Sequence, residues 1–110
     1  VLVEVNIGKE PTKSGVLPDK LSEYLDSLQN FRYIKPVGLM TVAPAQASEL
    51  ALERYFAQMY QLLEQGKERF GNEFTQLSMG MSHDYEAAVR QGATMIRIGT
   101  ALFGQRNYNI

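Results

Sequence analysis

The sequence contains no cysteine and no tryptophan, and it has a single histidine. Without thiols, the chain can form neither a disulfide framework nor a cysteine-based zinc site, and one histidine cannot build a histidine-rich metal cage. An excess of basic charge is also missing, because the 11 lysines and arginines face 12 aspartates and glutamates. Affinity for duplex nucleic acid depends on such an excess, so we expect no nucleic-acid partner.

Long hydrophobic runs are missing as well. No apolar stretch approaches the roughly 20 residues of a membrane-spanning helix. No secretory signal peptide is recognisable, since Glu4 interrupts the apolar start. We therefore expect a cytoplasmic protein with no membrane partner. Because the chain enters a strand pattern at Val1 with no polar lead-in, we also expect residues 1–110 to be part of a larger domain.

The rest of the chain alternates short apolar segments with amphipathic ones. Strands are expected at residues 1–7, 37–42, 74–81 and 95–98, the first of them covered on both faces. Helices are expected from Pro18, from Ser48 to about Arg69, from Ser82 to Gln91, and from Gly99 to Arg106. This alternation indicates βαβ units and a parallel sheet. Four units can form a small open sheet or half of a (β/α)8 barrel, and the pattern alone leaves both open.

Functional groups of parallel α/β folds lie where strands end and helices begin. Ser82 follows the third strand, where its hydroxyl can cap the next helix or join the neighbouring amides in binding a phosphate. Gly99 and Thr100 repeat this arrangement after the fourth strand. Two adjacent junctions rich in small donors favour a phosphate site.

Arg97 lies inside an apolar strand, on the same face as Gly99. A guanidinium there needs a partner, which can be a structural ion pair or a ligand at the barrel mouth. His83 is expected at the surface, and Lys9 and Lys13 in solvent. Four methionines are expected to fill the core: Met40, Met79, Met81 and Met95.

Two motifs carry a family resemblance. Residues 78–84 read SMGMSHD and residues 92–104 read GATMIRIGTALFG. With Asn6 and the Lys13–Ser14–Gly15 segment upstream, they make the chain resemble the pyridoxal phosphate homeostasis protein family. Those proteins are single-domain, fold-type III proteins related to the barrel of bacterial alanine racemase. The resemblance covers essentially the whole chain.

The resemblance implies an α/β fold, the (β/α)8 TIM barrel, with pyridoxal 5′-phosphate (PLP) at the mouth formed by the strand ends. This chain resembles only the C-terminal half, with four βα units. In the family, the lysine that forms the Schiff base lies at the end of the first strand, and neither Lys9 nor Lys13 corresponds to it. We therefore expect the chain to hold the phosphate end of the site without the covalent anchor.

The resemblance also assigns roles to the site residues. Ser82, Gly99 and Thr100 would bind the cofactor phosphate, with help from Ser78. Arg97 would face the pyridine nitrogen. Because arginine stays protonated and can only donate, the ring nitrogen would stay unprotonated and the cofactor would be a poor electron sink. That property suits a carrier better than a transaminase.

The implied function is non-catalytic binding and distribution of PLP inside the cell. A PLP-dependent amino-acid racemase is the alternative, although such an enzyme needs a second acid/base group, usually a tyrosine from another domain. A sugar-phosphate barrel enzyme that uses the same anion site is a third possibility. A half barrel leaves two sheet edges, at residues 1–7 and 95–98. We expect the missing N-terminal half, or a second copy of the chain, to cover them.

Overall fold

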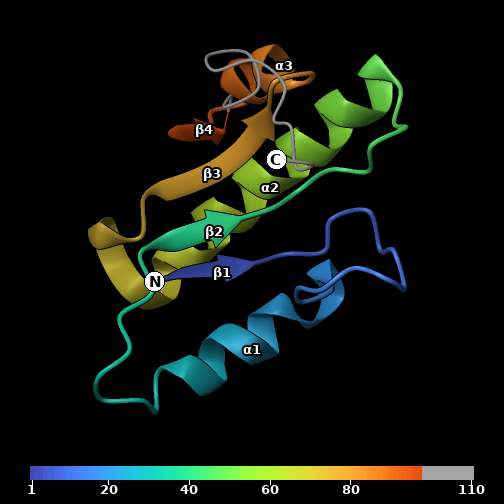
Figure 1. Ribbon diagram of the computed structural model, residues 1–110. Helices are drawn as coiled ribbons and strands as arrows, with labels where there is room; N and C mark the ends of the chain where they lie inside the picture. Colours follow the sequence, from blue (N-terminus) through green and yellow to red (C-terminus); the bar gives the residue numbers. More distant parts are fainter. Residues whose placement is uncertain (98–110) are drawn as a thin grey trace, which may run out of the picture.

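The computed structural model describes residues 1–97. Its helices and strands, in chain order, are β1 (Leu2–Glu4), η1 (Pro18–Lys20), α1 (Leu21–Leu28), β2 (Gly38–Met40), α2 (Glu49–Phe70), η2 (Gly71–Glu73), β3 (Gln76–Met81), α3 (Tyr85–Arg90) and β4 (Met95–Arg97). The four strands form one sheet in the order β1-β2-β3-β4, and each pair of neighbours is parallel (Figure 1). The predicted alternation and parallel sheet are confirmed. The helix expected from Gly99 to Arg106 lies outside the described residues.

The helices cover one face of the sheet. Val3, Leu39 and Leu77 lie side by side in register on that face, and each is buried. α2 runs behind β2 and β3, as Figure 1 shows. On the opposite face, Leu2 and Glu4 are only partly buried. The prediction that the first strand is covered on both faces is therefore wrong at Leu2 and Glu4, although Asn6, further along the same face, is buried.

The long helix α2 begins where its cap predicts. Ser48 has an extended backbone, and its hydroxyl accepts a hydrogen bond from the Ala51 N–H at 3.1 Å. A fully buried phenylalanine, Phe56, marks its inner face. Near the C-terminal end of α2, Gly66 lets the ring of Phe74 pack against the helix. A Cβ atom added to Gly66 would lie only 2.3 Å from Cε2 of that ring. α2 is thereby fixed against the sheet.

The first helix begins one turn later than predicted. Pro18 opens the short 3-10 segment η1, and the α-helix α1 follows from Leu21. The predicted apolar stripe of Leu21, Leu25 and Leu28 is buried. No helix among residues 1–97 is long and apolar enough to cross a membrane.

A bulge interrupts the pairing of β3 with β4. Ser78 pairs with Met95 and Met81 pairs with Arg97, so three steps along β3 oppose two along β4. Gly80, inside the bulge, has a φ of 103°. A bulge of this kind bends the strand and re-aims the residues that follow it. Here it leads the chain into a turn at residues 82–84 before α3 begins.

The methionines divide between the two faces. Met79 is fully buried against the helices, as predicted. Met81 and Met95 are 36% and 40% exposed. Met40 is only partly buried. Of the four methionines predicted to fill the core, only Met79 does so.

Candidate functional site

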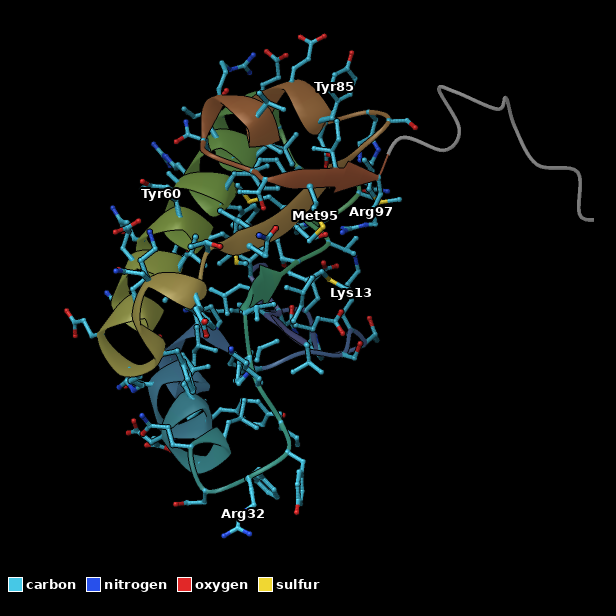
Figure 2. All side chains as sticks on the ribbon, turned by 90° about the vertical axis from the view of Figure 1, so that its left-hand side faces the viewer. Lys13, Arg32, Tyr60, Tyr85, Met95 and Arg97 are labelled. Carbon is cyan, nitrogen blue, oxygen red and sulfur yellow. The ribbon has the colours of Figure 1, made fainter. Side chains whose placement is uncertain are left out.

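Arg97 reaches across the strand ends on the uncovered face. One Nη atom donates to the hydroxyl of Ser78 in β3. The other donates to the backbone carbonyl of Thr41, just after β2, at 2.9 Å. Figure 2 shows Arg97 and Lys13 on the side of the sheet away from α2. The arginine therefore bridges three strands at the end where ligands bind in parallel α/β folds.

The partners of Arg97 are neutral. A hydroxyl and a carbonyl accept its hydrogen bonds, and no carboxylate of residues 1–97 forms an ion pair with it. The interpretation of Arg97 as half of a structural ion pair is thus wrong for the described part of the chain. Because neutral acceptors do not cancel its charge, the guanidinium remains a cationic donor for an anionic or electron-rich ligand.

Thr41 extends the hydrogen bonds of Arg97 as far as the first strand. Its side chain is fully buried, and its hydroxyl donates to the Val5 carbonyl at 2.5 Å. Its N–H donates to the Ser78 carbonyl at 3.0 Å. Hydrogen bonds thus run without interruption from the end of β1 to β4. Sequence reasoning missed Thr41, whose only signal is a polar residue at the end of an apolar strand.

Ser82 lies in the turn between β3 and α3. The turn is closed by Asp84, whose Oδ1 accepts from the Met81 N–H at 2.6 Å and whose own N–H donates to the Met81 carbonyl at 3.1 Å. Asp84, not Ser82, is the N-cap residue of α3, so the helix begins two residues later than a cap at Ser82 predicts. Ser82 is partly buried. It lies beside a shallow groove that the N-terminal ends of α2 and α3 also line.

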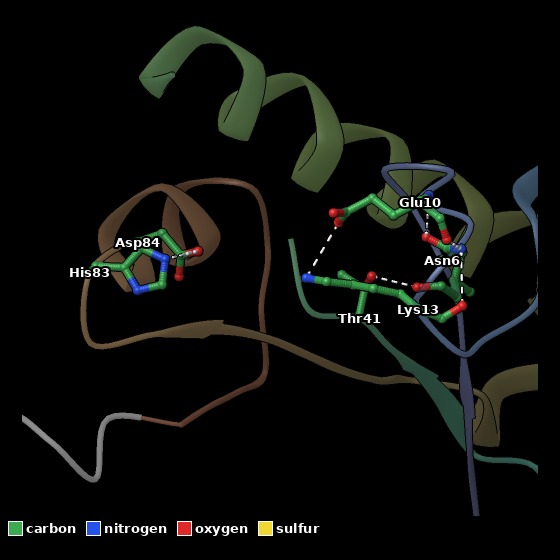
Figure 3. Close-up of polar contacts among 7 residues, drawn as sticks. Asn6, Glu10, Lys13, Thr41, His83 and Asp84 are labelled. Atoms are coloured by element: carbon green, nitrogen blue, oxygen red, sulfur yellow. Dashed lines mark hydrogen bonds and ion pairs between the residues drawn. The ribbon is translucent and has the colours of Figure 1, made fainter. Parts of the chain in front are cut away.

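His83 lies at the surface of the same turn. Its side chain is 53% exposed, which confirms the prediction, and its Nε2 lies 3.4 Å from Oδ2 of the buried Asp84 (Figure 3). Both oxygens of Asp84 are therefore engaged inside the turn. Residues 1–97 contain no cluster of histidines and acids that could hold a metal ion.

The loop after β1 is organised by a buried asparagine. The Asn6 side chain accepts from the Glu10 N–H at 3.0 Å and donates to the Glu10 carbonyl at 2.8 Å (Figure 3). Lys13 Nζ lies 3.3 Å from Glu10 Oε1, whereas Lys9 is 59% exposed and 4.0 Å from an Asp19 oxygen. Lys9 is solvated as predicted, and Lys13 is exposed as well.

The structure brings Ser78 and Arg97 into contact and places Ser82 directly after Met81, the residue that pairs with Arg97. Gly99 and Thr100 lie outside the described residues. A cationic guanidinium and a hydroxyl in a tight turn are suited to a ligand with an acceptor at one end and an anionic group at the other. PLP has both, in its pyridine nitrogen and its phosphate. The donor set therefore fits that group.

Comparison with known proteins identifies the class. A model of the family described as "Alanine racemase, N-terminal domain" matches residues 1–107. The pyridoxal phosphate homeostasis protein of Aquifex aeolicus is 42% identical over 108 residues, which are 98% of this chain and 47% of that protein. The Escherichia coli protein of the same name is 37% identical over 109 residues, 99% of this chain and 46% of that protein.

Solved structures agree with this match. PipY of Synechococcus elongatus, solved without PLP, has a TM-score of 0.85 and 35% identity over 94% of this chain and 48% of that one. The same protein with PLP bound has a TM-score of 0.79 and 33% identity, with coverage of 94% and 48%. The described strands and helices thus share the α/β fold of PipY, and the parallel sheet with its helices agrees with the expected partial (β/α)8 barrel.

The chain belongs to the alanine racemase N-terminal domain family. The predicted resemblance to the pyridoxal phosphate homeostasis protein family is confirmed, and the match to the C-terminal half stays a prediction. The chain spans about half the length of the curated relatives it matches, 47% in Aquifex aeolicus and 46% in Escherichia coli.

Proposed function

We propose that this chain supplies the non-covalent part of a PLP site in a protein that binds and distributes the cofactor without catalysing a reaction of its own. The observation that carries this proposal is the guanidinium of Arg97. It is held across the strand ends by neutral acceptors and forms no ion pair with a carboxylate of residues 1–97. The names of the relatives support it, as does the PLP bound in the solved structure of PipY.

Each residue has a distinct part in the proposed site. Ser82 contacts the phosphate, together with Gly99 and Thr100. Arg97 faces the pyridine nitrogen and holds it unprotonated, because a guanidinium donates and does not release its proton. When bound, PLP supplies a reactive aldehyde on an electron-accepting ring. An unprotonated ring nitrogen makes that ring a weak acceptor, which favours a carrier over an enzyme.

The chain corresponds, in this proposal, to the C-terminal half of the barrel, as the motifs around Ser82 and Arg97 indicate. The lysine that forms the Schiff base then belongs to the other half. Lys13 does not replace it, because it lies in the loop after what would be the fifth strand of the barrel.

A partner for the sheet edge is part of the proposal. Large apolar side chains lie exposed around β1, among them Val1 at 67%, Tyr24 at 43% and Ile34 at 40%. The Val1 carbonyl accepts from the Val37 N–H, and the Val5 N–H donates to the Met40 carbonyl. The backbone N–H and C=O of Leu2 therefore point to the other side of the strand, away from the sheet. We propose that the missing half of the barrel covers this edge. A stable monomer of the isolated chain in light scattering would contradict this.

The test is a titration of the protein that carries this chain with PLP, followed by the absorbance of the bound cofactor. We expect saturable binding and no racemisation of L-alanine beyond the rate of free PLP. Racemisation at enzyme-like rates would favour a racemase. Absence of PLP binding, with binding of a sugar phosphate instead, would favour the sugar-phosphate enzyme. The cytoplasmic location stays a prediction.

A further inference from the structure

We infer that Ser78 is a positioning residue for Arg97, so that it serves the ring end of the cofactor site and does not bind the phosphate. This inference rests on the proposed function. It changes the expected role of Ser78, which the family resemblance places beside the phosphate.

The first argument is the contact itself. The Ser78 hydroxyl accepts a hydrogen bond from one Nη of Arg97, and Ser78 is only 6% exposed. It is buried although it lies on the face that the helices leave uncovered. A side chain that is covered by the arginine and bonded to it is poorly placed to contact a ligand directly.

The second argument is that Arg97 needs two anchors. An arginine side chain has many rotamers, and one hydrogen bond leaves its planar head free to turn about that bond. Ser78 and the Thr41 carbonyl hold the two Nη atoms from two different strands. Two fixed acceptors define the plane of the guanidinium before any ligand arrives. Preorganisation of this kind strengthens binding by lowering the ordering cost.

The third argument is distance along the strand. Ser78 precedes Met81, where the turn of Ser82 begins, by three residues, and a strand rises about 3.3 Å per residue, so the two positions are separated by roughly 10 Å. The bulge at Gly80 lies between them. The backbone of Arg97 pairs with Met81 beside this turn, and its side chain reaches back along the sheet to Ser78. The hydroxyl of Ser78 therefore lies at the level of the guanidinium, separate from the turn of Ser82. A change at Ser78 should therefore alter the binding of the pyridine ring and leave the contacts to the phosphate intact.

The experiment compares PLP with pyridoxal, which has the same ring without the phosphate. Affinities for both are measured by fluorescence titration of the protein that carries this chain and of its Ser78→Ala variant. We expect Ser78→Ala to weaken both ligands by the same factor, about 3- to 10-fold, as for a lost neutral acceptor. Ser82→Ala is the matched control, and it should weaken PLP while leaving pyridoxal unchanged.

A double-mutant cycle with Arg97→Leu tests whether the serine acts through the arginine. We expect Ser78→Ala to have no further effect once Arg97 is replaced, which a residue that only stabilises the fold would not show. A loss confined to PLP, an effect that adds fully to that of Arg97→Leu, or no effect at all would each overturn the inference. If Ser78→Ala does not fold, Ser78→Cys takes its place with the same expected pattern, since a thiol accepts only weakly. Failure of the unaltered protein to bind PLP would instead contradict the proposed function.

Discussion

The Oδ1 atom of Asp84 accepts a hydrogen bond from the backbone N–H of Met81 at 2.6 Å, and this bond closes the turn that carries Ser82. Asp84 is only 6% exposed. The carboxylate therefore supplies an acceptor for the backbone N–H of the last residue of β3. A buried N–H left without an acceptor is costly, so the turn depends on this side chain.

We predict that Asp84→Ala destabilises the fold by about 1–3 kcal/mol, the usual cost of a buried donor left unpaired. Asp84→Asn keeps an oxygen at the same position and should lose less. Chemical denaturation of both variants measures the difference. Asp19→Ala is the control, because the side chain of Asp19 is 81% exposed. Equal losses for the Ala and Asn variants would show that the hydrogen bond is not what matters.

Gly80 is predicted to tolerate no side chain. Its φ is 103°, and an added Cβ would lie 2.7 Å from the Cβ of Ala88. Gly71 also has a positive φ, 76°, but nothing lies within 4 Å of its added Cβ. Gly71→Ala thus measures backbone strain alone, and Gly80→Ala should cost roughly 1–3 kcal/mol more because of overpacking. Equal thermal stability of the two variants would contradict the packing argument.

Stability at low pH should depend on Glu53. Its carboxylate accepts from Gln91 at 2.6 Å and from two nitrogens of Arg90, at 2.7 and 2.5 Å. The hydrogen bonds from Gln91 and Arg90 lower its pKa below the ordinary 4.5. A lowered folded-state pKa contributes stability above the unfolded pKa, and that stability is lost as the pH falls through the folded pKa.

The urea concentration at the midpoint of unfolding should fall when the pH is lowered from about 6 to about 3. This fall should be smaller in Glu53→Gln than in the unaltered protein. Glu86→Gln, which removes an exposed glutamate of α3, is the control and should leave that fall unchanged. If Glu53→Gln also leaves it unchanged, the bonds between α2 and α3 make no contribution that depends on the charge of Glu53.

Arg97 should dominate the affinity for PLP. A hydrogen bond to a charged group contributes about 1.5–3 kcal/mol, so Arg97→Leu is predicted to weaken binding about 10- to 100-fold. Fluorescence titration measures this loss. Arg32→Leu removes the same charge from the far end of the molecule (Figure 2) and should leave the affinity unchanged. A similar loss in both variants would indicate a general effect of charge.

The order of elements could be predicted because turn residues separate each apolar segment from the next. The cap at Ser48 and the stripe of Leu21, Leu25 and Leu28 depend on local chemistry, and the structure confirms both. Gly92 follows α3 with a φ of 102°, as its predicted position after that helix requires.

The site could be predicted only in part. The partners of Arg97 include a backbone carbonyl 56 positions earlier in the chain, which no local pattern encodes. Ser82 and Asp84 are both good capping residues by type, and residue type alone does not predict that α3 begins after Asp84. The exposure of Met81 and Met95 depends on what covers the sheet, which the chain's own pattern does not specify.

The most direct test of the central claim is a crystal structure of the protein that carries this chain with PLP bound. We predict that the phosphate lies within hydrogen-bonding distance of Ser82, and that the pyridine nitrogen faces an Arg97 still bonded to Ser78. Density for the cofactor elsewhere, or with its phosphate against Ser78, would contradict the account.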